Sequence, residues 1–341
     1  MKKIKKVSLG VIFYKNLKYI PKFLETIFNQ KKFNGEIEYI FRDQDPEKEV
    51  FFYIKKNFPE YFEKIKFFTK DGGFHSEGHN FLIKKSEGDL YFCLSNDMIY
   101  PENLVSKFVD FFEKNNEKIA TCKIKRWDFS IFAKTGNLEK SKSNFIDSIG
   151  IGICENHHFY DIGQGEKDFG QYDNLKEIFG PSGAFFVCDK NFFENNFFDE
   201  KNIPHYKNDC DFSYKLNWQG ISTKILTNIE VYHDRQLEGN GKKIFGKIKN
   251  LRERNDFFLG DSLKGHLNLL KKNFTFKFGA KIFLKTFANE VKKFLFFLIF
   301  KPKLLKIYFD FWKNSGKIEK NFDEKLENFG EKMKKILEQM E

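Results

Sequence analysis

The sequence lacks the patterns that mark several common classes of protein. Its five cysteines are scattered without a CxxC pair, so neither a zinc site nor a disulfide framework is indicated. A reducing cytoplasm is the simplest compartment for such a chain. The longest uninterrupted apolar run, residues 294–300, is far shorter than the roughly 20 residues of a membrane-spanning helix. The basic start of the chain is not followed by the apolar core of a signal peptide.

Two nucleotide-binding signatures are also missing. No GxGxxG follows an expected strand, and no GxxxxGK is followed by Ser or Thr. These absences exclude a dinucleotide-binding dehydrogenase of the usual kind and a P-loop enzyme. Any nucleotide that the chain binds must be held by other residues.

Positive charge is concentrated in one segment. The formal net charge of the whole chain is +11. Residues 242–317 hold 17 Lys and 2 Arg against 5 acidic residues, a net of +14, so the remainder of the chain sums to −3. The basic character of the chain therefore belongs to this C-terminal segment.

Apolar patterning predicts an alternation of strands and helices. The expected strands cover residues 7–14, 37–41, 65–69, 89–94 and 119–124. The expected helices between them cover residues 17–29, 50–58, 78–86 and 104–115. This order predicts an α/β fold with a mainly parallel sheet and helices on both of its faces.

Polar side chains follow two of these strands. Asp43 comes after the second strand, and Ser95, Asn96 and Asp97 come directly after the buried strand at 89–94. The carboxyl ends of parallel strands line one crevice. A carboxylate beside an amide and a hydroxyl suits a hard divalent cation, although the same residues also favour ordinary turns.

The second half of the chain is less regular. Residues 148–180 are rich in Gly, His, Gln and Asp, which predicts a long functional loop. An apolar strand is expected within 180–188, a helix at 212–219 and an extended segment at 221–232 that ends in His233. Asp209 and Asp211 precede the expected helix, where acidic residues also serve as simple caps.

The motifs, in this order, resemble those of the family 2 glycosyltransferases of GT-A fold, and within them the bacterial rhamnosyltransferase-like group. One part of the resemblance is the N-terminal strand and helix with the strand that ends in Asp43. The second part is His79-Asn80 with Glu87-Gly88-Asp89 through Asp97. The third part is the stretch Gly163 to Ala184. The fourth part is Phe198-Asp199-Glu200, followed by Asn208 to Asp211, Gly220 and His233. Together they span about residues 8–233.

The resemblance implies an inverting transfer of a sugar from a nucleotide-sugar donor, such as a dTDP- or UDP-sugar. Asp97 and His233 would hold Mg²⁺ or Mn²⁺, and Asp209 would be the catalytic base. The implied donor-binding residues are Tyr14, Asp43, Asn80, Asn96, Asp97, Ser182 and Gly183. Asp211, Glu166 and Asp168 would lie on the acceptor side or support the site.

Two positions depart from the family pattern. Ser95 stands where the family usually has Asp or Asn, and Asn208 stands where it often has Glu. These departures leave open a glycosyltransferase-like protein with impaired catalysis that binds a sugar nucleotide or glycan.

The basic C-terminal segment is expected to be helical, with a break at Pro302. Lys281, Lys285 and Lys292 share one side of a helix rich in aromatic residues, which favours peripheral association with an anionic membrane surface. The alternatives are packing on the catalytic domain and nucleic-acid binding; the latter is not expected, because no such motif occurs. The final residues, 322–341, are expected to form a solvated helix.

The expected organisation is therefore a catalytic domain at 1–238 and a helical, membrane-associated segment at 239–341. A lipid-linked or polysaccharide acceptor of the bacterial cell envelope would suit an enzyme on the inner face of the cell membrane.

Overall fold

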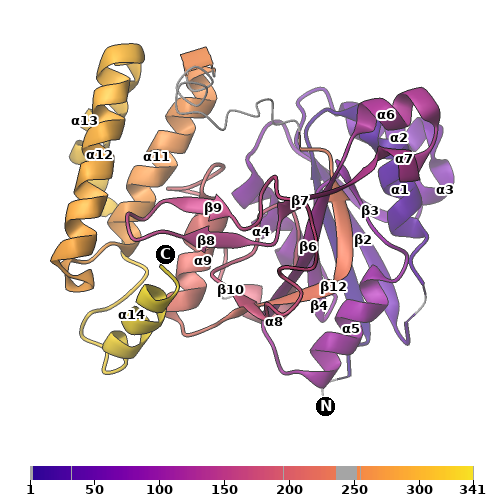
Figure 1. Cartoon of the computed structure of the whole chain (residues 1–341). Coiled ribbons are helices and arrows are strands. Elements are labelled where there is room, and N and C mark those ends of the chain that lie inside the picture. Colours follow the sequence, from indigo (N-terminus) through magenta and orange to yellow (C-terminus); the bar gives the residue numbers. More distant parts are fainter. Residues whose placement is uncertain (1–2, 32, 195, 236–251, 254, 341) are drawn as a thin grey trace. The chain divides into compact units, whose positions relative to one another are not determined.

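The computed structural model describes residues 3–31, 33–194, 196–235, 252–253 and 255–340 (Figure 1). The chain divides into two compact units. The first comprises Met1–Ile151, Asp161–Phe197 and Ser222–Arg235. The second comprises Gly152–Tyr160, Phe198–Ile221 and Gln236–Glu341. The domain boundary expected between residues 238 and 239 lies outside the described residues and stays a prediction.

The first unit is built on one large sheet. Its strands are β1 (Lys6–Phe13), β2 (Glu36–Asp43), β3 (Ile65–Thr69), β4 (Leu90–Leu94), β5 (Met98–Ile99), β6 (Ile119–Trp127), β7 (Lys142–Ser148), β10 (Glu177–Ile178), β11 (Phe186–Asp189) and β12 (Thr223–His233). The order across the sheet is β10-β12-β6-β11-β4-β1-β2-β3, with β5 paired to β12 and β7 to β6. A separate two-stranded sheet consists of β8 (Ile151–Ile153) and β9 (Phe159–Asp161).

Strand direction brings many carboxyl ends to one edge of the large sheet. β1 pairs in parallel with β2 and β4, β2 with β3, and β6 with β12. β11 runs antiparallel to both β4 and β6, so β6 and β12 point the same way as β4. The prediction of a mainly parallel sheet is confirmed.

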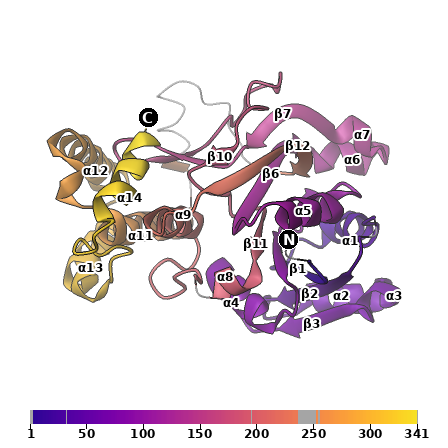
Figure 2. The same cartoon turned by 90° about the horizontal axis from the view of Figure 1, so that it is seen from below.

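Helices cover both faces of this sheet, as predicted (Figure 2). In the described part of the first unit they are α1 (Ile20–Phe28), α2 (Glu49–Asn57), α3 (Pro59–Phe62), α4 (His75–Lys85), α5 (Leu104–Lys114), α6 (Phe129–Thr135), α7 (Leu138–Ser141) and α8 (Lys190–Glu194). Apolar residues of α1, α2 and α5 share a core with alternate β1 residues, Val7, Leu9, Val11 and Phe13. On the other face α4 packs against β1 and β2, and α8 packs against α4 and β11.

The second unit is helical. Its described helices of more than one turn are α9 (Asn208–Trp218), α11 (Asp256–Asn273), α12 (Ala280–Phe300), α13 (Lys306–Asn314) and α14 (Phe329–Glu338). Leu259, Leu263 and Leu267 of α11 form a small apolar core with Phe297 of α12 and residues of α13. The predicted break at Pro302 is confirmed, because a 3₁₀ turn at Pro302–Leu305 separates α12 from α13. No helix in the described ranges has the length and apolarity that crossing a membrane would need.

Two expectations for this unit were wrong in detail. α9 begins at Asn208 instead of residue 212, so Asp209 and Asp211 lie in its first turn. The last helix begins only at Phe329, and it is not solvated on all sides. Phe329 stacks on Trp218, with ring centroids 5.4 Å apart, and Ile336 is fully buried. The local excess of charged residues hid this apolar stripe.

A buried cluster of charges joins α9 to α11. The Lys272 ammonium donates hydrogen bonds to Asp199 over 2.7 Å and to Asp211 over 2.5 Å. Asn273 and Asn321 donate to the other carboxylate oxygen of Asp211. Burial acts to lower the pKa of Lys272, but the two carboxylates outweigh it and raise this pKa above its ordinary value. One cation therefore balances two largely buried anions.

Removing that cation should destabilise the protein strongly. We expect Lys272→Met to lower the free energy of unfolding by about 3–5 kcal/mol, because the Asp199 and Asp211 carboxylates would stay buried without a counter-charge. Chemical denaturation measures the change. The matched control is Lys271→Met. Lys271 is adjacent to Lys272 in the chain, but its side chain makes no described ion pair with either carboxylate. Equal stability of the two variants would contradict the assignment.

Candidate active site

A short turn after β4 carries the polar residues Ser95, Asn96 and Asp97. The Ser95 amide donates to the Tyr100 hydroxyl, which donates in turn to the Ser95 carbonyl oxygen, over 2.9 and 2.8 Å. The Asp97 carbonyl oxygen accepts hydrogen bonds from the Trp127 indole and the Asp234 amide. These bonds fix the turn, so the Asp97 side chain is held at the carboxyl edge of the sheet.

His233 lies between two carboxylates at this edge. It ends β12 and pairs with Met98 of β5, which places it next to Asp97. Its Nε2 atom lies 3.4 Å from Oδ2 of Asp97. On the other side, Nδ1 donates to Oδ2 of buried Asp147 over 2.9 Å. The structure therefore brings Asp97 and His233 together, and Asp147 orients the imidazole ring.

Positive and negative charges are balanced around the triad of Asp97, His233 and Asp147. Burial acts to raise the pKa of Asp147, but the hydrogen bond from His233 and the nearby Arg235 and Arg126 outweigh it and hold that pKa below its ordinary value. Burial acts to lower the pKa of His233, but Asp97 and Asp147 raise it to about 10. Without a competing cation, His233 is therefore an imidazolium at neutral pH.

Further residues implied by the sequence lie at the same edge. The register pairs Phe186 of β11 with Cys93 of β4, and the Gly183 carbonyl oxygen lies 4.0 Å from the Cys93 sulfur, so Ser182 and Gly183 lie near the end of β4. The Asn96 side-chain Nδ2 is buried, and no described group accepts a hydrogen bond from it. A buried N–H group that has no acceptor within the described chain suits an anionic ligand at this place.

Three other donor-side candidates differ in their surroundings. Asp43 is fully buried, and its two carboxylate oxygens accept hydrogen bonds from the amides of Asp45 and Phe51. This is the capping of the following turn that the sequence also allowed. Burial is the main cause that raises the pKa of Asp43 above its ordinary value. Tyr14 follows β1 and is 58% exposed, whereas Asn80 lies buried on α4.

Glu166 and Asp168 belong to the long loop, and both have partners within the first unit. Tyr172 donates to Glu166 over 3.1 Å. Asp168 forms ion pairs with Lys123 at 2.8 Å and Lys125 at 2.9 Å. Burial acts to raise the pKa of Asp168, but these two lysines lower it to about 2. The loop is therefore tied to β6 by buried charge.

Asp209 and Asp211 belong to the second unit. Oδ1 of Asp209 accepts a hydrogen bond from the amide of Cys210 in the first turn of α9, and the side chain is only partly buried. Asp211 is buried in the cluster with Lys272. Asp209 therefore has the more accessible carboxylate of the two.

Sequence reasoning missed Asp147 and Arg235. Arg235 forms an ion pair with Asp161 at 2.8 Å and lies 3.5 Å from Asp147. Asp147 follows the apolar pair Phe145-Ile146 on β7, where the sequence predicted no strand. The only local signal for it is an acidic residue directly after an apolar pair.

Most of the first unit lies within a match to a known family. The chain matches the profile of glycosyl transferase family 2 over residues 8–189. The chain belongs to glycosyl transferase family 2. The match covers Asp43, Asp97 and Asp147, whereas Asp209 and His233 lie beyond its end.

Solved structures share the fold of this chain. GalNAc-T7 with UDP, GalNAc and Mn²⁺ has a TM-score of 0.57 at 13% identity, with 80% of this chain and 48% of that chain covered. The mannosyltransferase PcManGT from Pyrobaculum calidifontis, with GDP-Man and Mn²⁺, has a TM-score of 0.50 at 11% identity, with 92% and 76% covered. The chain thus spans about half of the GalNAc-T7 chain. No curated protein sequence matches it.

The raised pKa of His233 predicts a pH-dependent stability. Folding raises this pKa from 6.5 to about 10. The protonated His233 therefore contributes fully to the free energy of unfolding below pH 6.5, and this contribution is lost as pH rises through 10. In a chelating buffer we expect the excess melting temperature of wild type over His233→Gln to be largest near pH 6 and to shrink toward pH 10.

The control is His158→Gln, which replaces an exposed histidine outside this triad. Its melting temperature should follow that of wild type at every pH. A constant gap between wild type and His233→Gln would contradict the imidazolium between two carboxylates.

Proposed function

We propose that the protein is an inverting glycosyltransferase that moves a hexose, with rhamnose the leading candidate, from a dTDP- or UDP-sugar to a lipid-linked or polysaccharide acceptor. The observation that carries this proposal is the triad in which Asp147 orients His233 toward Asp97. A carboxylate that fixes the far nitrogen of a histidine is a common feature of metal-ligating histidines.

Asp97 and His233 would hold Mg²⁺ or Mn²⁺. The donor set fits, because a carboxylate oxygen and an imidazole nitrogen lie 3.4 Å apart and the other imidazole nitrogen is already hydrogen-bonded. Bound there, the ion would neutralise the charge that develops on the departing diphosphate. The Mn²⁺ present with UDP or GDP-Man in the two structural neighbours supports this choice.

The donor would lie along the carboxyl edge. The buried Nδ2 of Asn96 would donate to a diphosphate oxygen. Ser182 has a small side chain and Gly183 has none, so this stretch near the end of β4 would permit close approach of the donor sugar. Tyr14, exposed after β1, would contact the base, with Asp43 and Asn80 supporting the nucleotide pocket. The side chain of Ser95 would add a hydroxyl in place of the usual carboxylate.

Asp209 would act as the base. Its partly exposed carboxylate would take the proton from the acceptor hydroxyl as that oxygen attacks the anomeric carbon opposite the leaving diphosphate. Asp211 would support it, because the buried contact to Lys272 anchors the same helical turn. Glu166 and Asp168 would order the loop on the acceptor side.

A cavity in the second unit supports an amphiphilic acceptor. Its volume is about 360 Å³, and its lining combines Leu259, Leu263, Phe296 and Phe297 with Lys207 and Lys292. Lys207 is two residues from Asp209 along the chain. Apolar walls together with lysines in the lining suit a lipid that carries a phosphate group.

An apolar face of α12 supports association with an anionic membrane surface. Leu284, Phe287, Leu295, Leu298 and Ile299 are each between 47% and 67% exposed. Single exposed apolar residues are ordinary, but a row of them along one helix in a segment of net positive charge is typical of an interfacial helix. Lys281 and Lys285 are paired with Glu155, so other basic residues would meet the headgroups.

Two substitutions test the catalytic assignment. With Mn²⁺ and a panel of nucleotide sugars, we expect Asp209→Asn to lower kcat by about 10²–10⁴-fold with little change in donor affinity, because only the proton acceptor is lost. Asp97→Asn should instead weaken donor binding and abolish its dependence on Mn²⁺. Initial rates and donor titrations separate the two effects.

The matched control is Asp110→Asn, which alters an exposed acidic residue of α5 in the first unit, outside the proposed site. Wild-type turnover in Asp209→Asn would remove Asp209 as the base. Donor binding without turnover in wild type would instead favour the catalytically impaired alternative.

Membrane association is tested on vesicles of mixed anionic and zwitterionic phospholipids. We expect Phe287→Glu to lower the vesicle-bound fraction by about tenfold or more, because it removes one buried aromatic ring from the bilayer contact. Phe52→Glu, equally exposed at 58% but located on α2, should bind like wild type. Salt-dependent binding to RNA without binding to vesicles would reverse this proposal.

A further inference from the structure

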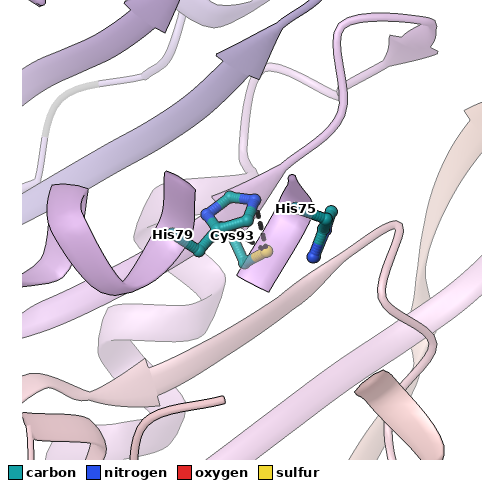
Figure 3. Close-up of side chains that lie close together, drawn as sticks. All are labelled: His75, His79 and Cys93. Carbon is teal, nitrogen blue, oxygen red and sulfur yellow. Dashed lines mark hydrogen bonds between the residues drawn. The ribbon is translucent and has the colours of Figure 1, made fainter. Parts of the chain in front are cut away.

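Two histidines and a cysteine meet on the α4 face of the sheet (Figure 3). His75 and His79 are four residues apart on α4, so they lie one turn apart on the same side of the helix. Cys93 comes from β4, beneath that helix. One nitrogen of each histidine and the sulfur of Cys93 all lie within 4.8 Å of one another. Imidazole nitrogen and thiolate sulfur are the ligands that Zn²⁺ prefers.

The closest pair already has the separation of metal ligands. Nε2 of His79 lies 3.3 Å from Sγ of Cys93. Zn–N and Zn–S bonds of about 2.0 and 2.3 Å at a tetrahedral angle place the two ligand atoms about 3.5 Å apart. A small rotation of the partly exposed His75 ring, whose centroid is 4.6 Å from that of His79, would complete a three-ligand set.

A second residue fixes the orientation of His79. Its Nδ1 atom is hydrogen-bonded to the Tyr91 hydroxyl over 2.9 Å, which turns Nε2 toward Cys93. The Tyr91 ring lies over Gly10 of β1, where any side chain would collide with it. With Nδ1–H donating to Tyr91, Nε2 presents its lone pair to the cluster, as in metal sites whose histidines are held by an outer hydrogen bond.

Burial supports a soft metal over a hard one. His79 and Cys93 are 1% and 0% exposed, and His75 is the more accessible member through which an ion would enter. The cluster contains no carboxylate, so Mg²⁺ would find none of its preferred oxygen ligands among these side chains. The Gly183 carbonyl oxygen, 4.0 Å from the Cys93 sulfur, or a water molecule would fill the fourth position.

We propose that His75, His79 and Cys93 form a binding site for Zn²⁺. This site shares no residue with Asp97 and His233, and it does not depend on the proposed sugar transfer. Binding releases the thiol proton of Cys93 to solvent and forms one Zn–S and two Zn–N bonds, with no change in oxidation state. The ion would clamp α4 to β4 next to the turn that carries Asp97.

Cobalt substitution of the full-length protein tests the site. Purified protein is stripped with a chelator and titrated with Co²⁺, whose thiolate charge-transfer band reports only sulfur ligation. We expect one equivalent of Co²⁺ to produce the band, and Zn²⁺ to displace it and raise the melting temperature. Cys93→Ser should abolish the band, and His75→Ala should weaken Co²⁺ affinity at least tenfold. Tyr91→Phe should weaken it about tenfold through the loss of the outer hydrogen bond.

The matched control is Cys188→Ser, which alters an equally buried thiol on the neighbouring strand β11 and should keep the band. Because His75 is only partly buried, His75→Ala keeps the test valid even if Cys93→Ser fails to fold. If His79 and Cys93 are only a hydrogen-bonded pair in the core, wild type should show no band. That result would overturn the proposal. A band that survives Cys93→Ser, or wild-type affinity in His75→Ala, would overturn it as well.

Discussion

The balance of charge around His233 is the constraint on which the carboxyl edge depends. One imidazole stands between Asp97, in the turn after β4, and Asp147, near the end of β7. Arg235 and Arg126 each lie 3.5 Å from the other carboxylate oxygen of Asp147 and add positive charge beside it. Strands that are far apart in sequence are therefore joined by a few partly buried charges.

A similar principle holds the helical unit together. Lys272 of α11 lies between Asp199 and Asp211, and the apolar cores around it contribute packing that a polar cluster alone would not supply. The exposed residues of α12 have a different character, because they form an apolar surface with nothing from the described chain over it. The second unit thus combines a buried ion-pair cluster in the helical turn that carries Asp209 with an exposed apolar surface on α12.

Much of the fold could be predicted because its signals are local. Apolar runs of five to eight residues, separated by amphipathic helices, gave β1, β2, β3, β4 and β6 and the parallel arrangement that they imply. The final helix was misjudged, because two buried apolar residues, Phe329 and Ile336, were outweighed by the surrounding charges in sequence. The antiparallel insertion of β11 between β4 and β6 was not predicted either, since nothing local specifies which strands pair.

The sequence by itself determined the polar strand ends, the family resemblance and the basic C-terminal segment, because each is a property of neighbouring residues. Only the tertiary structure decided which of these residues meet. Asp147 joins His233, Lys272 joins Asp199 and Asp211, and two histidines of α4 join Cys93. These partners are 14 to 86 residues apart in the chain. Their distances in space are set by strand order and register, which arise from the packing of the whole unit and leave no local trace in the chain.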